Sequence, residues 1–327
     1  MAWKNLKQQS LAEAMLVDLE AIKELDEVHD LINWSRLECL LSDIHSSKRG
    51  EKAWPPLMMF KALLLQSWYK LSDPGLEKQL ARDLLFRRFI QLDISEKVPD
   101  HSTFWRFRKK LENLLLMEQL LEEINAQLTD QGLLIKTGGV SIIDASVIEA
   151  KQCRPNKDKD GNSTQDKDAD WNVKAGSDGK RKSTYGFKAH INVDEDGFIK
   201  KVDYTSGSVH DSNCFTALLS NDDVEVYADS AYRSKKHDSW LHRHGIKNKV
   251  LKRAYRNRPL TTKEKQFNKL ASGVRCTVER VFGVLKQHYG MAKARYLGIS
   301  RNRTRFELMC IAHNMKRGIS VRQDNFV

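Results

Sequence analysis

The chain has 327 residues and a mass of 37.7 kDa, a length that suggests about two domains. Its 55 Lys and Arg residues exceed 43 Asp and Glu residues, which gives a net charge of +12. The mean hydropathy is −0.56 and no long uncharged apolar window occurs, so we expect no membrane span. The N-terminus also lacks the pattern of a signal peptide. Five scattered cysteines without a CxxC pair argue against a disulfide scaffold or a cysteine zinc site, and favour a reducing, cytoplasmic location.

The excess positive charge lies in the last quarter of the chain. Residues 251–327 contain 18 Lys and Arg residues but only 4 Asp and Glu residues, a net charge of +14. The first 250 residues therefore carry a net charge of −2. Such a segment favours a polyanion as partner, although a merely basic soluble surface is the alternative interpretation.

The first 135 residues predict helices. Periodic Leu, Ile and Val residues indicate two helices before residue 45, and Pro55-Pro56 opens a strongly apolar third one. Ser72 is the expected cap of a helix that begins at Pro74, and Ser102 the expected cap of the helix Thr103–Lys110. The helices expected in this half cover roughly 11–32, 35–44, 55–71, 74 onward, 103–110 and 113–130.

From Gly138 the hydrophobic period changes from that of a helix to that of a strand. The Asp194–Gly197 segment predicts a hairpin turn between two strands, and 151–183 is expected to be a polar loop with one tryptophan, Trp171. Strands are expected at 140–147, 183–193, 198–205, 224–229 and near 249–251, and helices at 211–220, 234–244, 262–288 and 302–317. This order predicts an α/β fold with a mixed sheet flanked by helices.

Three carboxylates stand in positions suited to catalysis. Asp144 lies inside an apolar strand, Asp229 ends another, and Glu279 lies on the basic helix between Arg275 and Lys286. If they converge, they form a hard-oxygen site for Mg²⁺ or Mn²⁺, and two such ions can drive an in-line phosphoryl transfer. Arg275 and Lys286 would then hold phosphates beside it. Alternatively, Asp144 caps a loop at a strand end, and Glu279 is a solvent-facing partner of Arg275.

An ordered set of short sequence blocks runs along the chain at Trp68–Asp73, Val98–Phe104, Ile143–Ala150, Tyr185–Asp194, Ser208–Asp211, Ala228–Tyr232, Arg275–Lys286 and Lys293–Gly298. Together these blocks resemble the DDE transposases of the IS-five family of insertion sequences, within the IS-four superfamily. The resemblance covers roughly residues 45–317. One departure is Ser272, where the superfamily signature has a Tyr three residues before the Arg, so the role of that Tyr cannot be carried over.

The resemblance implies an RNase H-like (retroviral-integrase-like) catalytic core at 136–327. A helical domain at 1–135 would precede it and serve in DNA-end binding and dimerisation. Asp144, Asp229 and Glu279 would bind two Mg²⁺ or Mn²⁺ ions. The enzyme would bind the terminal inverted repeats of its element, cleave the ends, and transfer the 3′-hydroxyls to target DNA. A homodimer on double-stranded DNA, associated with the bacterial nucleoid, is the expected assembly.

Further residues are candidates for DNA contact, each with a structural alternative. Lys188 and His190 share one face of a strand and either contact phosphate near the site or form a structural pair. Arg106 and Arg108 lie on a basic helix that could enter a groove, although part of that helix must be core. Trp171 could stack on an unpaired base, or hold its loop to the body of the protein.

Two other function classes fit the same sequence. One is a non-catalytic DNA-binding regulator or a transposase remnant. The other is a metal-dependent nuclease that hydrolyses DNA without strand transfer. A nicking assay separates the first from a transposase, and a strand-transfer assay separates the second.

Overall fold

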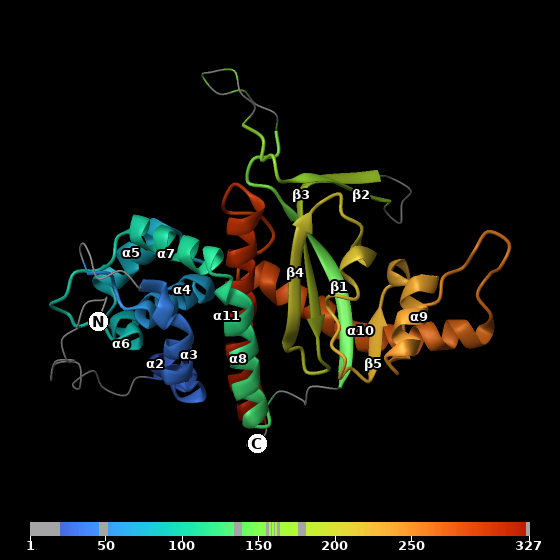
Figure 1. Cartoon of the computed structure of the whole chain (residues 1–327), viewed down its shortest axis with the longest axis horizontal. Coiled ribbons are helices and arrows are strands. Elements are labelled where there is room, and N and C mark those ends of the chain that lie inside the picture. Colours follow the sequence, from blue (N-terminus) through green and yellow to red (C-terminus); the bar gives the residue numbers. More distant parts are fainter. Residues whose placement is uncertain are drawn as a thin grey trace. The chain divides into compact units, whose positions relative to one another are not determined.

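The computed structural model (Figure 1) describes residues 20–45, 52–133, 139–154, 157, 159, 161, 164–175 and 181–324. The chain forms two compact units. The first comprises Met1–Leu133 with Glu307–Val327, and the second Leu134–Phe306. None of the described helices is long and apolar enough to cross a bilayer.

The first unit is helical. Its apolar centre is α4 (Pro56–Trp68), where eleven of thirteen residues are buried because the helix is hydrophobic on all sides. Lys61 is buried among them with 1% exposure, and its Nζ lies 4.3 Å from the centre of the Trp34 ring. The helices are α2 (Glu20–Leu31), α3 (Trp34–Leu41), the 3₁₀ helix η1 (Ser42–His45), α4 (Pro56–Trp68), α5 (Asp73–Arg82), α6 (Leu84–Ile90), α7 (His101–Asn113), α8 (Leu116–Asp130) and α11 (Ile299–Asp324) from Glu307 onward.

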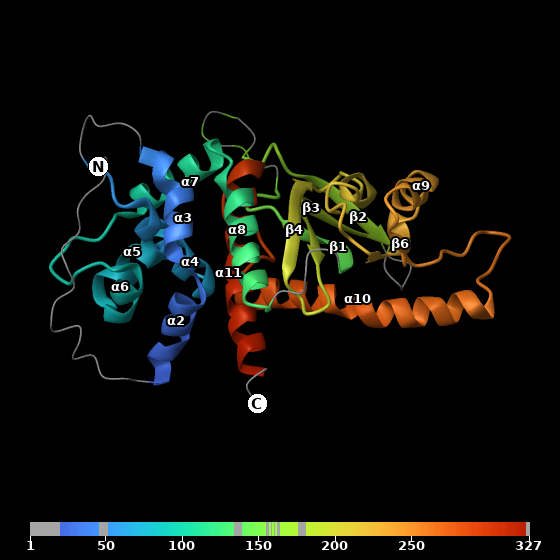
Figure 2. The same ribbon diagram turned by 60° about the horizontal axis from the view of Figure 1, so that its bottom comes forward.

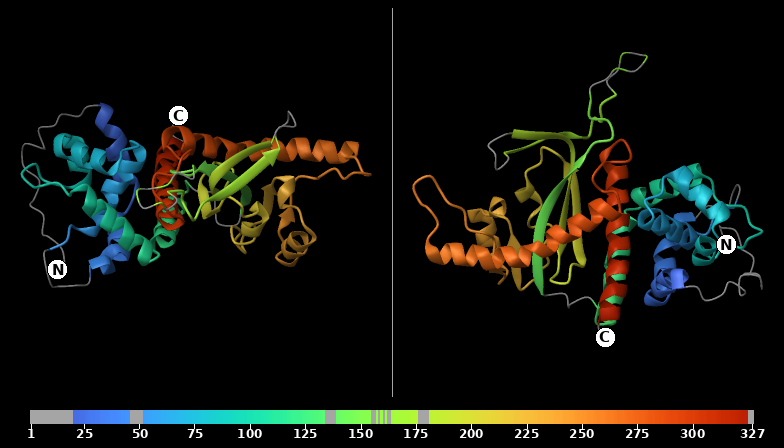
Figure 3. Two further views of the ribbon diagram at one scale, coloured as in Figure 1. Left: turned by 90° about the horizontal axis from the view of Figure 1, so that it is seen from above. Right: turned by 180° about the vertical axis from the view of Figure 1, so that it is seen from behind.

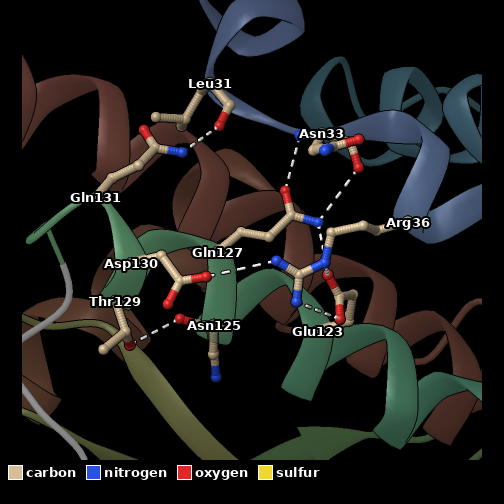
Figure 4. A network of polar contacts seen from close by, with 9 residues as sticks. All are labelled: Leu31, Asn33, Arg36, Glu123, Asn125, Gln127, Thr129, Asp130 and Gln131. Carbon is tan, nitrogen blue, oxygen red and sulfur yellow. Dashed lines mark hydrogen bonds and ion pairs between the residues drawn. The ribbon is translucent and has the colours of Figure 1, made fainter.

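A polar network joins α8 to the α2–α3 corner (Figure 4). The Gln127 side chain accepts from the Asn33 amide at 2.7 Å and donates to the Asn33 carbonyl, so it satisfies backbone groups left open between the helices. Arg36 forms an ion pair with Glu123 at 2.6 Å and with Asp130 at 3.4 Å. These contacts fix α3 against α8 at the rim of the apolar core.

The caps decide where the helices of this unit begin. The Ser72 side chain accepts from the Gly75 amide, so the predicted cap of α5 is confirmed. The prediction for α7 was wrong, because Asp100 is its N-cap and Ser102 lies inside the first turn. Asp100 caps the helix because its carboxylate accepts from the Thr103 amide at 2.6 Å. Helix α6, a short helix capped by Asp83, was not predicted from the sequence.

The second unit is built on a mixed six-stranded sheet. Its path is β2-β3-β1-β5-β6, and β4 pairs with β3. Strands β1, β3 and β4 are antiparallel neighbours, whereas β5 runs parallel to β1, and β6 parallel to β5. The four strands β1 to β4, joined in antiparallel pairs, and the parallel strands β5 and β6 that follow confirm the expected α/β core preceded by a helical region. The strands are β1 (Val140–Glu149), β2 (Asp170–Ala175), β3 (Arg181–Val193), β4 (Ile199–Ser206), β5 (Glu225–Ala228) and β6 (Lys247–Asn248).

Helices cover both faces of this sheet (Figures 2 and 3). The long helix α10 (Thr262–His288) runs across one face and contacts β1, β3 and β5. The other face carries an apolar cluster in which Ile143 and Ala228 pack with Leu241 of α9 (Lys235–Arg243). Because side chains alternate along a strand, Asp144 is directed away from this cluster, toward α10.

Two sequence predictions for this unit were wrong. The polar segment 151–183 contains the strand β2, which extends the sheet by pairing with the first half of β3. The polar composition of β2 gives no alternating apolar pattern that would predict a strand. Pairing with β3, and not a buried apolar face, orders this strand. The helix expected over 211–220 is only the 3₁₀ turn η2 (Asp211–Cys214), followed by turns. The hairpin turn at Asp194–Gly197 is confirmed, with Gly197 at φ 84°.

Candidate active site

The strand register brings Asp144 and Asp229 to neighbouring positions. Strands β1 and β5 are parallel, and their last pair is Ile143 with Ala228. Asp144 lies one residue further along β1, and Asp229 lies one residue beyond the end of β5. Neighbouring strands lie about 4.8 Å apart, so the backbone places both carboxylates at one point of the sheet. Asp229 is also the N-cap of the 3₁₀ helix η3 (Ser230–Tyr232), where it accepts from the Ser230 amide at 2.5 Å.

Helix α10 supplies the third carboxylate and a basic group. The Arg275 guanidinium lies 3.6 Å from Oδ2 of Asp144 and 4.0 Å from Oε1 of Glu279. Asp144 and Glu279, which are 135 residues apart in the chain, are therefore both within reach of one cation. Arg275 and Glu279 face the same way because residues four apart lie on one face of a helix.

The exposed fractions show what this cluster offers to a ligand. The Arg275 side chain is 11% exposed and that of Asp144 is 22% exposed, whereas that of Glu279 is 60% exposed. A buried guanidinium between two carboxylates neutralises part of their repulsion. Glu279 reaches into solvent, so the open side of the cluster is its α10 edge.

The donor set suits a divalent cation, since three carboxylates offer only hard oxygen ligands. Their side chains are not gathered into a ligand cluster, however. Within the described part of the chain, no group of three or more His, Cys, Asp or Glu side chains is arranged to hold a metal ion. The Arg275 guanidinium lies on Asp144, and the Asp229 carboxylate caps the Ser230 amide.

Tyr232 is a buried neighbour of the cluster that the sequence analysis did not single out. Its side chain is 1% exposed, and its hydroxyl has no hydrogen-bond partner among the described residues. Burial raises the pKa of the Tyr232 phenol well above its usual value, and the negative charges of Asp144 and Asp211 add to the rise. The phenol is therefore neutral. Its place three residues after Asp229, in a block already noted, was the available signal.

Lys188 and His190 lie inside the protein, on the sheet face opposite to Asp144. They pair directly with Val147 and Ala145, and directly opposed residues in an antiparallel pair share a face. Lys188 is 6% exposed and forms a 2.9 Å ion pair with Asp211.

His190 is fully buried as well. Its Nε2 is 2.8 Å from the Thr205 hydroxyl. Burial lowers the pKa of His190, so the ring is neutral near pH 7. Lys188 and His190 therefore both contact other groups of the protein, as the structural alternative for this pair predicts.

The two arginines of α7 have different surroundings. Arg108 is buried, with an ion pair to Asp73 at 2.6 Å and a hydrogen bond to Gln66 at 3.1 Å. Arg106 is exposed, and its guanidinium donates to the Thr103 hydroxyl at 3.0 Å. Of these two arginines, Arg106 presents its charge to solvent and Arg108 does not.

Two further candidates lie near the sheet. Lys286 lies about two turns beyond Glu279 on α10 and is partly buried. Trp171 on β2 is 51% exposed, and its ring packs edge-on against Tyr185 of β3 at 5.3 Å. The tryptophan thus makes a contact within the ribbon formed by β2 and β3, and still shows half of its surface to solvent.

Comparisons with known proteins place this sequence in a family. Residues 136–315, more than half of the chain, match the family "Transposase DDE domain". Residues 15–110 match a second family, "Transposase domain (DUF772)". This pair of matches is consistent with the IS-five group.

Among solved structures, the chain is similar to a pre-cleavage Mos1 transpososome, with 10% identity, 86% of this chain and 82% of that chain covered, and a TM-score of 0.21. It is also similar to a Mos1 strand transfer complex, with 10% identity, 86% and 84% covered, and a TM-score of 0.19. The match of residues 136–315 contains the two strands and the helix that carry Asp144, Asp229 and Glu279. The chain belongs to the DDE transposase family, enzymes that cut DNA and transfer its strands.

Proposed function

We propose that this transposase binds the terminal inverted repeats of an insertion sequence, cleaves the ends, and joins their 3′-hydroxyls to target DNA. The single observation that supports it most is the convergence on Arg275 of Asp144 from β1 and Glu279 from α10, beside the strand end that carries Asp229. These residues come from three separate elements of one unit.

DDE transposase domains use divalent metal ions. In our proposal the ligands are Asp144, Asp229 and Glu279, and the metal is Mg²⁺ or Mn²⁺, two per active site. When bound, such ions activate a water or a 3′-hydroxyl and stabilise the leaving oxygen of the phosphodiester. The accessibility of Glu279 supports this role, since its carboxylate is 60% exposed beside a more buried Asp144.

The basic residues of the same helix hold the DNA in this proposal. Arg275 contacts the carboxylates in the free protein and is placed to contact a phosphate oxygen once cations balance those carboxylates. Lys286 lies farther along α10 and would bind the backbone on the other side of the scissile phosphate. Arginine suits the first position because its planar guanidinium can hold two oxygens at once.

The remaining assignments are also proposals. The helical region 1–135 would bind DNA ends and support dimerisation, and 136–327 would be the catalytic domain. A homodimer on paired DNA ends and association with the nucleoid complete the assembly. The exposed Arg106 on α7 is the end-binding group that best fits this role.

The test is a metal-dependent cleavage assay on linear duplexes that carry the ends of the element with flanking DNA. We expect Asp144→Ala, Asp229→Ala and Glu279→Ala each to lower cleavage by several orders of magnitude while DNA binding persists. Glu225→Ala, on β5 but away from the site, is the control and should cleave like the unmodified chain. Full cleavage by any of the three variants would exclude that residue from the site.

A second assay distinguishes transposition from simple hydrolysis. Pre-cleaved ends with a free 3′-hydroxyl are incubated with a supercoiled plasmid and Mg²⁺. Joined products support strand transfer, whereas nicking without joining would favour the nuclease alternative. Binding without any cleavage would favour the non-catalytic regulator.

A further inference from the structure

A strongly basic segment precedes and opens helix α10. It runs from Lys252 to Leu270, and we call it the basic arm. It contains one acidic residue, Glu264, against seven basic ones. The basic residues are Lys252, Arg253, Arg256, Arg258, Lys263, Lys265 and Lys269.

The basic arm is ordered by polar contacts and not by burial. None of its residues, all of which the structure describes, is buried. The Asn268 side chain accepts from the Lys252 amide at 2.8 Å and donates to the Lys252 carbonyl at 3.0 Å. These two bonds fix the segment that precedes α10 to the helix. Thr261 and Glu264 form a reciprocal capping box at the start of α10. The basic arm is therefore an ordered segment although it is not buried. Figure 2 shows it extending past the β6 edge of the sheet.

An exposed stripe runs along α10 from the basic arm to the active site. Lys265, Lys269, Ser272, Cys276 and Glu279 are all exposed. At 100° per residue their directions fall within about 80° of one another, so they form one face of the helix. The two lysines lie at one end and the catalytic-site Glu279 at the other, and the residues between them are small. Small side chains allow a ligand to approach the helix closely.

The length of this stripe corresponds to a length of DNA. Lys265 precedes Glu279 by 14 residues, which is about 21 Å along a helix. Base pairs rise by about 3.4 Å, so the same length spans about six of them, or roughly half a turn. The backbone of a duplex is a dense row of negative charge, and the basic arm offers the complementary charge.

We propose that the basic arm binds the phosphate backbone of the element-end duplex about half a helical turn from the phosphate at Glu279, with α10 setting that spacing. This inference rests on the proposed function, because it takes Glu279 as the point of cleavage. The occupant is the element end and not target DNA. In the proposed function end cleavage comes before joining, so the element end is the first duplex to lie along the stripe that joins the lysines to Glu279.

The first experiment measures binding of the element-end duplex as a function of salt, with Asp144→Ala throughout so that no DNA is cut. We expect Lys265→Gln/Lys269→Gln to weaken binding and to lower the slope of log K against log salt by about 1.8, or two phosphate contacts. Lys235→Gln/Lys236→Gln, two exposed lysines of α9, removes the same charge and should change the slope little. Lys265→Arg/Lys269→Arg should restore the slope. An equal change of the salt slope in Lys265→Gln/Lys269→Gln and in the α9 control would overturn the proposal.

The second experiment measures the spacing. Iron–EDTA is coupled either to the native exposed Cys276 or to Lys265→Cys in a chain with Cys276→Ser, both with Cys39→Ser and Cys153→Ser. The two tethers are 11 residues apart, so their cuts on the end duplex should be centred about five base pairs apart. Cuts from Cys276 alone, or cuts from Lys265→Cys only on target DNA, would overturn the proposal.

The nick made by the unmodified chain is mapped on the same duplex. If the five-base-pair offset is found but the Cys276 cuts lie far from the nick, the basic arm binds DNA and the proposed active site is wrong. If the nick coincides with the Cys276 cuts but the cuts from Lys265→Cys are not offset from them, the proposed active site is supported. The proposed role of the basic arm is then wrong.

Discussion

Arg275 is the residue that connects the elements of the candidate active site. It is largely buried, and both Asp144 and Glu279 lie within 4.0 Å of its guanidinium. Two carboxylates at such a point repel each other unless a cation lies between them. In the free protein Arg275 supplies that cation, and in the proposed complex it is available for a phosphate.

We expect Arg275→Gln to weaken binding of the element-end duplex and to lower its salt slope by about 0.9, the value for one phosphate contact. The control is Arg280→Gln on the same helix, where the arginine is exposed and donates to the Thr277 hydroxyl at 3.1 Å. Fluorescence anisotropy over a range of salt concentrations measures both slopes. An identical slope for Arg275→Gln and the unmodified chain would contradict the phosphate contact.

Lys61 makes a pH-dependent contribution to stability. Burial lowers the pKa of its amine from 10.5 to about 8, and Nζ has no hydrogen-bond partner among the described residues. Since the folded pKa lies below the unfolded one, the full cost of the buried charge is present below pH 8. The cost disappears between pH 8 and 10.5, where the folded state loses its proton first.

We therefore expect Lys61→Met to raise the free energy of unfolding of the helical unit by about 1 to 2 kcal/mol at pH 7, net of the lost contact with Trp34. The difference should shrink as the pH approaches 10.5. Denaturant unfolding at pH 7 and pH 10 measures it, with the exposed Lys78→Met of α5 as control. A difference that grows with pH would contradict the assignment.

At the scale of elements, α7 combines a structural and a surface arginine only two residues apart. Arg108 closes a buried cluster with Asp73 of α5 and Gln66 of α4, so it ties three helices together. Arg106 points to solvent from the same helix. One face of α7 therefore packs into the core, and the other exposes Arg106 to solvent.

Substituting each arginine separates these roles. Arg108→Gln leaves the Asp73 carboxylate buried without its cation and should lower the free energy of unfolding by about 3 kcal/mol. Arg106→Gln should change it by less than about 1 kcal/mol, because exposed ion pairs contribute little, and should weaken end binding instead. Denaturant unfolding and DNA-binding titrations on both variants provide the measurement. A stable Arg108→Gln chain with weakened binding would reverse the two roles.

In the proposed function, helix α10 links catalysis to DNA binding within one element. Its C-terminal half packs on the sheet through Val278, Val281 and Leu285, whereas its N-terminal half buries no side chain before Ala271. A 27-residue helix can extend so far because a capping box and polar contacts order its exposed end. The division of the helix into a packed half and a charged half positions the lysines relative to Glu279.

At the scale of the whole molecule, the charge of +12 is unevenly distributed. The first 250 residues carry −2, and the segment that begins with the basic arm carries +14. That segment also contains Glu279, so the proposed phosphate-binding surface and the proposed metal ligand lie on the same part of the chain. Long-range attraction to DNA would therefore bring the duplex to the acidic site.

We expect two protomers to bind two DNA ends in one complex. Analytical ultracentrifugation of Asp144→Ala with end duplexes should show a species of two chains and two duplexes. The same measurement without DNA is the reference for the free chain. A complex of one chain with one duplex at saturating concentrations would contradict the proposed dimer.

The sequence by itself predicted most of the order of the elements and the helix at 262–288, because hydrophobic periodicity and short motifs are local properties. It also singled out the three acidic residues as candidates, whose catalytic role stays a prediction. It could not determine what Lys188, His190 and Arg108 contact, since burial depends on the elements packed against them. Only the tertiary structure decided that β2 is a strand, because β3 provides its hydrogen bonds. The strand register likewise decided that Asp144 and Asp229 lie side by side, since pairing between distant segments leaves no local pattern.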